Sequence, residues 1–143
     1  MVDTKTQYYK IKEEVDAAVI KVLESSQFIG GKVVNDFAEN LAKYHGSKYC
    51  IPCANGTDAL QIALMALGLE SGDEVITPSF TYIATVEVAA LLRLKPVFVD
   101  VDKRTFCIDP LALEKAITPK TKAIIPVHLY GHAANMEEIL AIE

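Results

Sequence analysis

The sequence lacks the features that mark several classes of protein. It has no basic excess, because 14 lysines and arginines stand against 19 acidic residues and give a net charge of −5. General nucleic-acid binding, which relies on a basic surface, is therefore not expected. No apolar run approaches the roughly 18 residues of a membrane-spanning helix. The early, mixed charges of Asp3, Lys5 and Lys10 are unlike a signal peptide. We expect a cytoplasmic protein.

Cysteine is scarce as well. Three cysteines, an odd number in a mostly apolar setting, favour reduced thiols over a disulfide framework. Cys50 and Cys53 have C-x-x-C spacing, but a zinc site needs a second pair and a redox site needs an exposed helix N-terminus. Both residues fall in an apolar strand candidate, which predicts inert thiols. Asp100 and Asp102 after a strand are either a metal-binding acidic pair or solvated carboxylates.

The length and residue composition of the chain fit a globular protein. A chain of 143 residues, 51% hydrophobic and 23% charged, can form one modest domain with a real core. Near the C-terminus, Asn135 is a good N-cap and Glu137 and Glu138 suit a first helical turn, but no stop signal follows. We expect the chain to be a fragment of a longer protein.

The apolar pattern predicts an α/β fold with a mainly parallel sheet. An amphipathic helix carries Ile11 to Leu23 on one face and ends near Ser25 and Ser26, and a second runs from an Asn35 cap to Tyr44. From Tyr49 onward strands and helices alternate, which favours parallel strands with right-handed crossovers. The strands are expected at 49–54, 74–77, 96–100 and 123–127, and the helices at 57–67 (buried nearly all round), at 83–92, after Asp109-Pro110 and after Asn135.

Ligands of such folds bind beyond the carboxyl ends of the strands. The segments at Asn55, at Pro78–Tyr82 and at His128–Gly131 follow strand candidates, so we expect them to converge. Asn55-Gly56-Thr57 opens a helix, where free backbone N–H groups and the positive dipole end can hold a phosphate. It lacks the lysine of a P-loop. The same residues also suit a plain capped helix.

Two further side chains have alternative interpretations. Tyr82 can cover a flat ligand or belong to the core, since aromatic rings bury well without one. His128 can face a ligand or be held by a hydrogen bond in its loop. It lies four residues from His132, but Gly131 between them argues against a helix and the pattern is not H-E-x-x-H.

Five stretches follow one another along the chain: Phe28-Ile-Gly-Gly, Ala54-Asn-Gly-Thr-Asp-Ala-Leu, Gly72-Asp-Glu-Val-Ile-Thr-Pro-Ser-Phe-Thr-Tyr-Ile-Ala-Thr, Pro96-Val-Phe-Val-Asp-Val-Asp and Pro126-Val-His-Leu-Tyr-Gly. Together they resemble the DegT/DnrJ/EryC1/StrS family of sugar aminotransferases, which use pyridoxal 5′-phosphate (PLP) on the fold-type I scaffold. The resemblance covers nearly the whole chain in order. Between Cys50 and Ile62 the sequence is most similar to one subgroup of the family. This subgroup aminates a UDP-linked 3-keto-N-acetylglucosaminuronic acid for surface polysaccharide, including lipopolysaccharide.

This resemblance implies roles for particular residues. Gly56 and Thr57 match the positions that hold the PLP phosphate, and Tyr82 matches the aromatic residue that stacks on the pyridine ring. Ser26 and Phe28 match loop positions that border the nucleotide sugar, although the subgroup often has tyrosine where Phe28 stands. The resemblance also implies that Asp100 and Asp102 form a structural strand end without a metal, and that the cysteines belong to the core.

The resemblance also implies an organisation. Residues 1–34 would form an N-terminal helix and substrate-side loop, and residues 35–143 part of the large PLP-binding domain of a homodimer. The lysine that forms the Schiff base and the acidic partner of the pyridine nitrogen are expected beyond Glu143. The amino donor would be glutamate, and we expect this chain to be inactive alone. The alternatives are a non-catalytic or regulatory protein of the same fold and a metal-dependent nucleotide-sugar glycosyltransferase that uses Asp100 and Asp102.

Overall fold

A computed structural model describes residues 2–142 of the chain. Its internal contacts divide the chain between Pro52 and Cys53 into two compact units, which we describe separately. The domain boundary predicted between residues 34 and 35 stays a prediction. In the described residues, no helix combines the length and the apolar character needed to cross a membrane.

The first unit contains the helices α1 (Thr4–Ser25) and α2 (Lys32–His45). Asp3 caps α1 by accepting a hydrogen bond from the Thr6 backbone N–H at 2.9 Å. α2 ends at Gly46, whose φ of 69° is the left-handed value that glycine adopts readily. The prediction that Asn35 caps α2 is wrong. Its N–H bonds to the Gly31 carbonyl at 3.2 Å, so Asn35 lies within the first helical turns.

The first unit buries little of its own apolar surface. None of the α1 side chains is buried, and Ala42 is the one buried residue of α2, both helices lying wholly within the described range. The apolar residues predicted to share one face of α1 are exposed to solvent, since Val19 is 53% and Leu23 57% exposed. The helices of this unit therefore depend mainly on local hydrogen bonds and capping.

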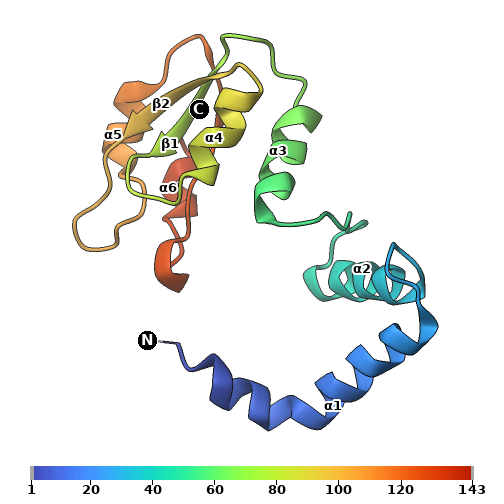
Figure 1. Cartoon of the computed structure of the whole chain (residues 1–143). Helices are drawn as coiled ribbons and strands as arrows, with labels where there is room; N and C mark the ends of the chain where they lie inside the picture. The colour runs from blue at the N-terminus through green and yellow to red at the C-terminus, as the bar shows by residue number, and fades with distance from the viewer. Residues whose placement is uncertain (1, 143) are drawn as a thin grey trace. The chain divides into compact units, whose positions relative to one another are not determined.

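The second unit is built on a parallel sheet of three strands in the order β2-β1-β3. Figure 1 labels two of them, β1 and β2. The strands are β1 (Glu74–Pro78), β2 (Lys95–Val99) and β3 (Thr121–Ile124). The helices α4 (Ala84–Leu91) and α5 (Pro110–Ala116) supply the crossovers that parallel pairing requires. Asp109 caps α5 through the Leu111 N–H at 2.9 Å, with Pro110 at the first helical position as predicted. The predicted α/β fold with a parallel sheet is confirmed.

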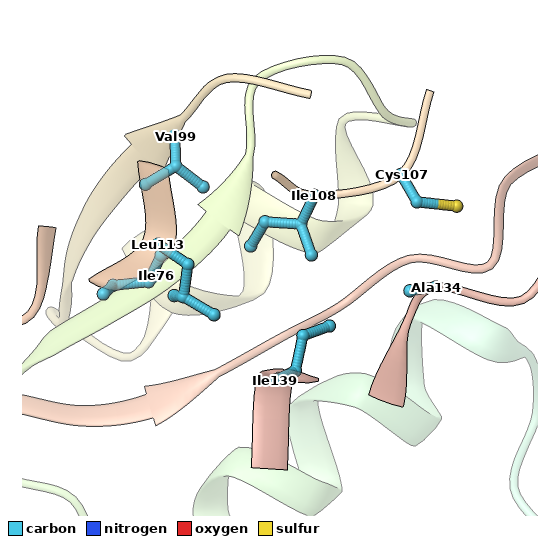
Figure 2. Close-up of a cluster of buried hydrophobic side chains, with 7 residues drawn as sticks. All are labelled: Ile76, Val99, Cys107, Ile108, Leu113, Ala134 and Ile139. Carbon is cyan, nitrogen blue, oxygen red and sulfur yellow. The ribbon is translucent and has the colours of Figure 1, made fainter. Parts of the chain in front are cut away.

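Each face of the sheet has its own apolar core. Ile76 points to one face and packs with a cluster from the β2–α5 region and from α6 (Met136–Leu140), shown in Figure 2. Its neighbour Val75 points to the other face, where it packs with side chains of α4 and of α3 (Gly56–Ala66). This alternation follows from the period of two residues in a strand. All five residues of β1 are buried.

The expected strand at 49–54 does not form. These residues, all described, have no regular secondary structure, and Tyr49 and Ile51 are 73% and 78% exposed. A strand needs a neighbouring backbone with which to exchange hydrogen bonds, and β1, β2 and β3 pair only with one another. β3 also begins and ends earlier than the predicted 123–127, although the Ile125 N–H continues the ladder to the Ile76 carbonyl at 2.8 Å.

The expectation that the helix at 57–67 is buried nearly all round is also wrong. In α3, which lies within the described range, Leu64 is the one fully buried residue. The chain has apolar side chains on both sides of this helix, but the unit supplies a partner for only one side. The chain instead exposes apolar surface on α3, α4 and their ends, where Ile62, Met65, Leu67, Ile83 and Leu91 are each at least 45% exposed.

A polar cluster closes the amino end of the sheet. The carboxylate of Glu74, a residue only 5% exposed, accepts hydrogen bonds from Thr118 Oγ1 at 2.6 Å and from Lys95 Nζ at 2.9 Å. These hydrogen bonds hold the pKa of Glu74 below its ordinary value. The hydrogen bond from Thr118 has the larger effect, and the one from Lys95 comes second. A depressed carboxyl pKa means that the cluster stabilises the fold at neutral pH and ceases to do so as Glu74 is protonated.

We expect Thr118→Val to make the fold more sensitive to acid. Without its largest hydrogen bond the folded-state pKa of Glu74 rises toward the ordinary glutamate pKa of about 4.3, so stability is lost at a higher pH as the solution is acidified. Circular dichroism during titration from neutral to acidic pH gives the midpoint. Thr4→Val, in the first turn of α1, is the control and should leave the midpoint unchanged. An unshifted midpoint for Thr118→Val would contradict the assigned cluster.

We also expect residues 1–143, prepared as an isolated chain, to bind a dye specific for apolar surface and to self-associate. The exposed side chains of α3 and α4 form the physical basis, because contiguous apolar surface of this kind drives association. Fluorescence of the dye and light scattering measure the two effects. A strictly monomeric chain without dye binding would overturn this expectation, whereas Ile62→Lys and Met65→Lys together should reduce both signals.

Candidate functional site

The carboxyl edge of the sheet gathers the predicted ligand segments of the second unit. β1 leads into Pro78–Tyr82 and the neighbouring β3 leads into His128–Gly131, so both segments leave the same edge. α3 is joined to the amino end of β1 by residues 67–73 and packs against α4, which places its first turn toward the carboxyl edge (Figure 1). A site on this edge therefore receives side chains from three different connections.

The first turn of α3 is fixed by Asn55. Its backbone is extended, with φ −164° and ψ 176°, and its side-chain oxygen accepts from the Asp58 N–H at 3.0 Å. The side-chain amide donates to Asp58 Oδ2 at 3.1 Å, and the Asn55 carbonyl accepts from the Ala59 N–H at 3.1 Å. These contacts form an N-cap in which both ends of the Asn55 side chain are engaged.

The cap leaves two backbone donors for a ligand. In the described part of the chain, neither the Gly56 N–H nor the Thr57 N–H donates to a protein acceptor, and the Thr57 hydroxyl has no protein partner either. A Cβ placed on Gly56 would meet no atom within 4 Å, so the turn is open. Two free N–H groups and one hydroxyl at the positive end of a helix of 11 residues are suited to a phosphate.

Tyr82 lies between β1 and α4 with its side chain 76% exposed. Its backbone carbonyl accepts from the Thr85 N–H at 3.3 Å, so the main chain is held at the start of α4 while the ring remains free. The interpretation of Tyr82 as a core residue is wrong, because a core tyrosine would be buried. The exposed ring can lie against a flat ligand.

Ser26 and Phe28 lie together in the first unit. They line an open pocket of about 630 Å³ with Gln27, Ile29, Gly31 and Lys32. Ser26 ends α1 in the left-handed conformation, with φ 55°, and Phe28 is 65% exposed. The loop between α1 and α2 therefore brings Ser26 and Phe28 to one pocket, and their place beside a nucleotide sugar stays a prediction.

The acidic pair and the loop histidine have structural partners. Asp100 accepts from the Val101 N–H at 2.8 Å, and Asp102 accepts from the Arg104 and Thr105 N–H groups at 2.9 and 3.0 Å. The backbone hydrogen bonds to Asp102 lower its pKa, and the one from Arg104 has the largest effect. His128 is exposed, and its Nδ1 accepts from the Ala134 N–H at 3.0 Å, which supports the interpretation of a hydrogen-bonded loop histidine.

The expectation that the cysteines belong to the core holds for one of them. Cys107 is buried and belongs to the cluster of Figure 2. Cys50 is half-buried and Cys53 is exposed, because the segment that contains them does not pair as a strand. The Cys53 thiol instead donates to the Asn55 carbonyl at 3.3 Å, beside the first turn of α3.

Sequence reasoning missed Tyr130. Its backbone is left-handed, with φ 54° and ψ 27°, and its side chain is 84% exposed at the carboxyl edge. A bulky residue rarely adopts this conformation. The nearest sequence signal is the following Gly131, which marks a turn but does not indicate that the tyrosine itself has a positive φ.

Known proteins resemble this chain in sequence. The model of the DegT/DnrJ/EryC1/StrS aminotransferase family matches residues 9–143. The UDP-2-acetamido-2-deoxy-3-oxo-D-glucuronate aminotransferase of Pseudomonas aeruginosa is 57% identical over 99% of this chain and 39% of its own length. A pleiotropic regulatory protein of Geobacillus stearothermophilus is 50% identical over 99% of this chain and 38% of its own. This chain thus spans about two fifths of either relative.

A solved structure supports the fold. The crystal structure of NtdA from Bacillus subtilis with bound cofactor PMP superposes with a TM-score of 0.87 at 41% identity, over 93% of this chain and 31% of that chain. The parallel sheet with flanking helices is thus the fold expected from the sequence.

We expect Asn55→Ala to loosen the first turn of α3 and to cost about 1 kcal/mol of stability, the usual cost of losing an N-cap. Urea unfolding measures the loss, and hydrogen exchange at the Asp58 amide should accelerate because its acceptor is gone. Asn55→Asp is the matched control. It keeps an acceptor oxygen at the cap and should recover most of the stability, so equal losses in both variants would contradict the capping role.

Proposed function

The chain belongs to the DegT/DnrJ/EryC1/StrS aminotransferase family, and from this we propose that the complete protein transfers an amino group to a nucleotide-linked keto-sugar with the help of PLP. One observation on the chain itself carries the proposal. The helix that follows the Asn55 cap leaves the N–H groups of Gly56 and Thr57 and the Thr57 hydroxyl without protein partners, at the sheet edge where Tyr82 is exposed.

The residues present fit the two ends of PLP. Its phosphate requires several donors and a positive potential, which Gly56, Thr57 and the start of α3 supply. Its pyridine ring is flat and apolar on its faces, and the free ring of Tyr82 can lie against one of them. When bound, the cofactor supplies an electron sink and carries the amino group between donor and acceptor.

The roles of this chain are binding and orientation. Asn55 holds the first turn of α3 in the geometry that keeps two N–H groups available. Thr57 adds a hydroxyl donor whose hydrogen bond to a charged phosphate is stronger than one to a neutral group. Tyr82 fixes the plane of the ring and excludes water from one face. None of these groups carries out proton transfer.

We further propose that the lysine responsible for proton transfer lies beyond Glu143. Lys95 supports this proposal, because it starts β2 at the opposite, amino edge of the sheet and is bonded to Glu74 at 2.9 Å. Lys120 and Lys122 lie at the same amino edge, immediately before β3 and within its first two residues. The isolated chain would then bind part of the cofactor without catalysing transamination.

The proposed substrate is a UDP-linked 3-keto-N-acetylglucosaminuronate used for surface polysaccharide, with glutamate as amino donor. The 57% identity to the Pseudomonas aeruginosa enzyme of that type supports the sugar class. Ser26 and Phe28 would border the nucleotide sugar, with Phe28 contributing a ring without a hydroxyl. A cytoplasmic homodimer remains part of the proposal.

A regulatory role is the second candidate, because one relative at 50% identity is named a pleiotropic regulatory protein. Turnover distinguishes the two functions. A complete protein that binds PLP but converts no keto-sugar with glutamate would favour the regulatory role. The glycosyltransferase alternative is less well supported, since both Asp100 and Asp102 accept hydrogen bonds from their own loop.

We expect Thr57→Ala in the complete protein to weaken PLP retention about 10- to 100-fold, the range for losing a hydrogen bond to a charged group. Equilibrium dialysis, with the bound cofactor measured by its absorbance, gives the affinity. Thr57→Ser should restore most of it, and Thr4→Ala should have no effect. Equal PLP affinity in Thr57→Ala and the unsubstituted protein would contradict the phosphate site.

A further inference from the structure

Tyr130 is the aromatic residue whose conformation the fold explains least. It is left-handed at φ 54° although it is neither glycine nor asparagine, and its side chain, 84% exposed, forms no hydrogen bond or aromatic pair within the described residues. Such a conformation persists only where surrounding contacts impose it, and it concentrates at ligand sites. The ring gains nothing from its own unit that would offset the backbone cost.

The contacts that impose the conformation lie on both sides of Tyr130. The Leu129 carbonyl accepts from the His132 N–H at 2.9 Å, and His128 Nδ1 accepts from the Ala134 N–H at 3.0 Å. These two hydrogen bonds close the loop around residue 130. Tyr130 is therefore held at the tip of a braced turn, which gives the ring a defined starting direction.

Tyr130 and Tyr82 lie in the connections that follow two neighbouring strands. Ile76 of β1 is paired with Ile124 of β3, and Tyr82 and Tyr130 each lie six residues beyond these partners. Neighbouring strands are about 4.8 Å apart, so the two connections leave the sheet side by side. Both tyrosines are more than 75% exposed. Two exposed aromatic rings thus lie in the connections that leave one edge of the sheet.

We propose that Tyr130 is a substrate-contacting residue that recognises the sugar ring of the nucleotide sugar. The inference rests on the proposed function and extends it, since Tyr82 is assigned to the cofactor ring and Tyr130 is not used by the cofactor site. A phenol has an apolar face and a polar tip. A pyranose ring presents C–H groups on its face and hydroxyl groups at its rim, so it complements both parts of the tyrosine.

Three variants of the complete, PLP-loaded protein test the proposal. Tyr130→Gly removes the ring and suits the positive φ, so it should not lower thermal stability. Tyr130→Phe removes only the hydroxyl. Tyr44→Phe is the matched control, since Tyr44 is also 84% exposed and lies in α2. Calorimetric titration with UDP-N-acetylglucosamine and with UDP separates contacts to the sugar from contacts to the nucleotide.

We expect Tyr130→Gly to weaken UDP-N-acetylglucosamine binding about tenfold, with a smaller loss for Tyr130→Phe and none for Tyr44→Phe. UDP affinity and PLP retention should be unchanged in all three. Equal affinity of Tyr130→Gly and the unsubstituted protein for UDP-N-acetylglucosamine overturns the proposal. So does an equal loss for UDP, or a lower thermal stability or altered oligomeric state of Tyr130→Gly, because these indicate a nucleotide-binding or structural role.

Failure of the proposed function has a different signature. Unsubstituted protein that retains PLP but binds neither UDP nor UDP-N-acetylglucosamine is no nucleotide-sugar aminotransferase, and the assignment of Tyr130 is then overturned with it. Protein that binds UDP-N-acetylglucosamine equally well with and without the Tyr130 ring overturns the inference alone.

Discussion

The parallel pairing of β1 with β2 on one side and β3 on the other is the interaction on which the second unit depends. β1 is buried over all five residues, and its alternate side chains enter the two cores. The ladder also directs every connection, because parallel strands must be joined by crossovers that return over a face of the sheet. Losing the pairing of β1 would therefore remove both cores together.

The same pairing creates the candidate site. Strands that run in one direction end at one edge, so the segments after β1 and β3 emerge together, and α3 directs its first turn toward them. Asn55 then decides which N–H groups remain available, since its side chain takes that of Asp58 and leaves those of Gly56 and Thr57. Electrostatics and hydrogen bonding at this turn favour a phosphate, whatever the rest of the ligand is.

The exposed groups at this edge are held in place by different interactions. The first turn of α3 is stabilised by its own cap, whereas Tyr130 is held in a left-handed conformation by the hydrogen bonds of its neighbours. The apolar sides of α3 and α4 are covered only where they meet the sheet and each other. Binding groups and uncovered apolar surface thus coexist in one unit, which agrees with a chain that spans about two fifths of its relatives.

The sequence by itself determined the features that depend on a few neighbouring residues. The caps at Asn55, Asp109 and Asn135 and the alternation of strands and helices were predictable, because their signals are local. Tertiary structure decided the rest. The apolar residues 49–54 form no strand without a partner backbone, and Glu74 has its low pKa because Thr118, 44 residues away, reaches it. The left-handed Tyr130 is a local feature by contrast, held by hydrogen bonds between residues three and six positions apart. Strand pairing and the Glu74 contact were not predictable from local signals, because they depend on residues brought together from distant parts of the chain.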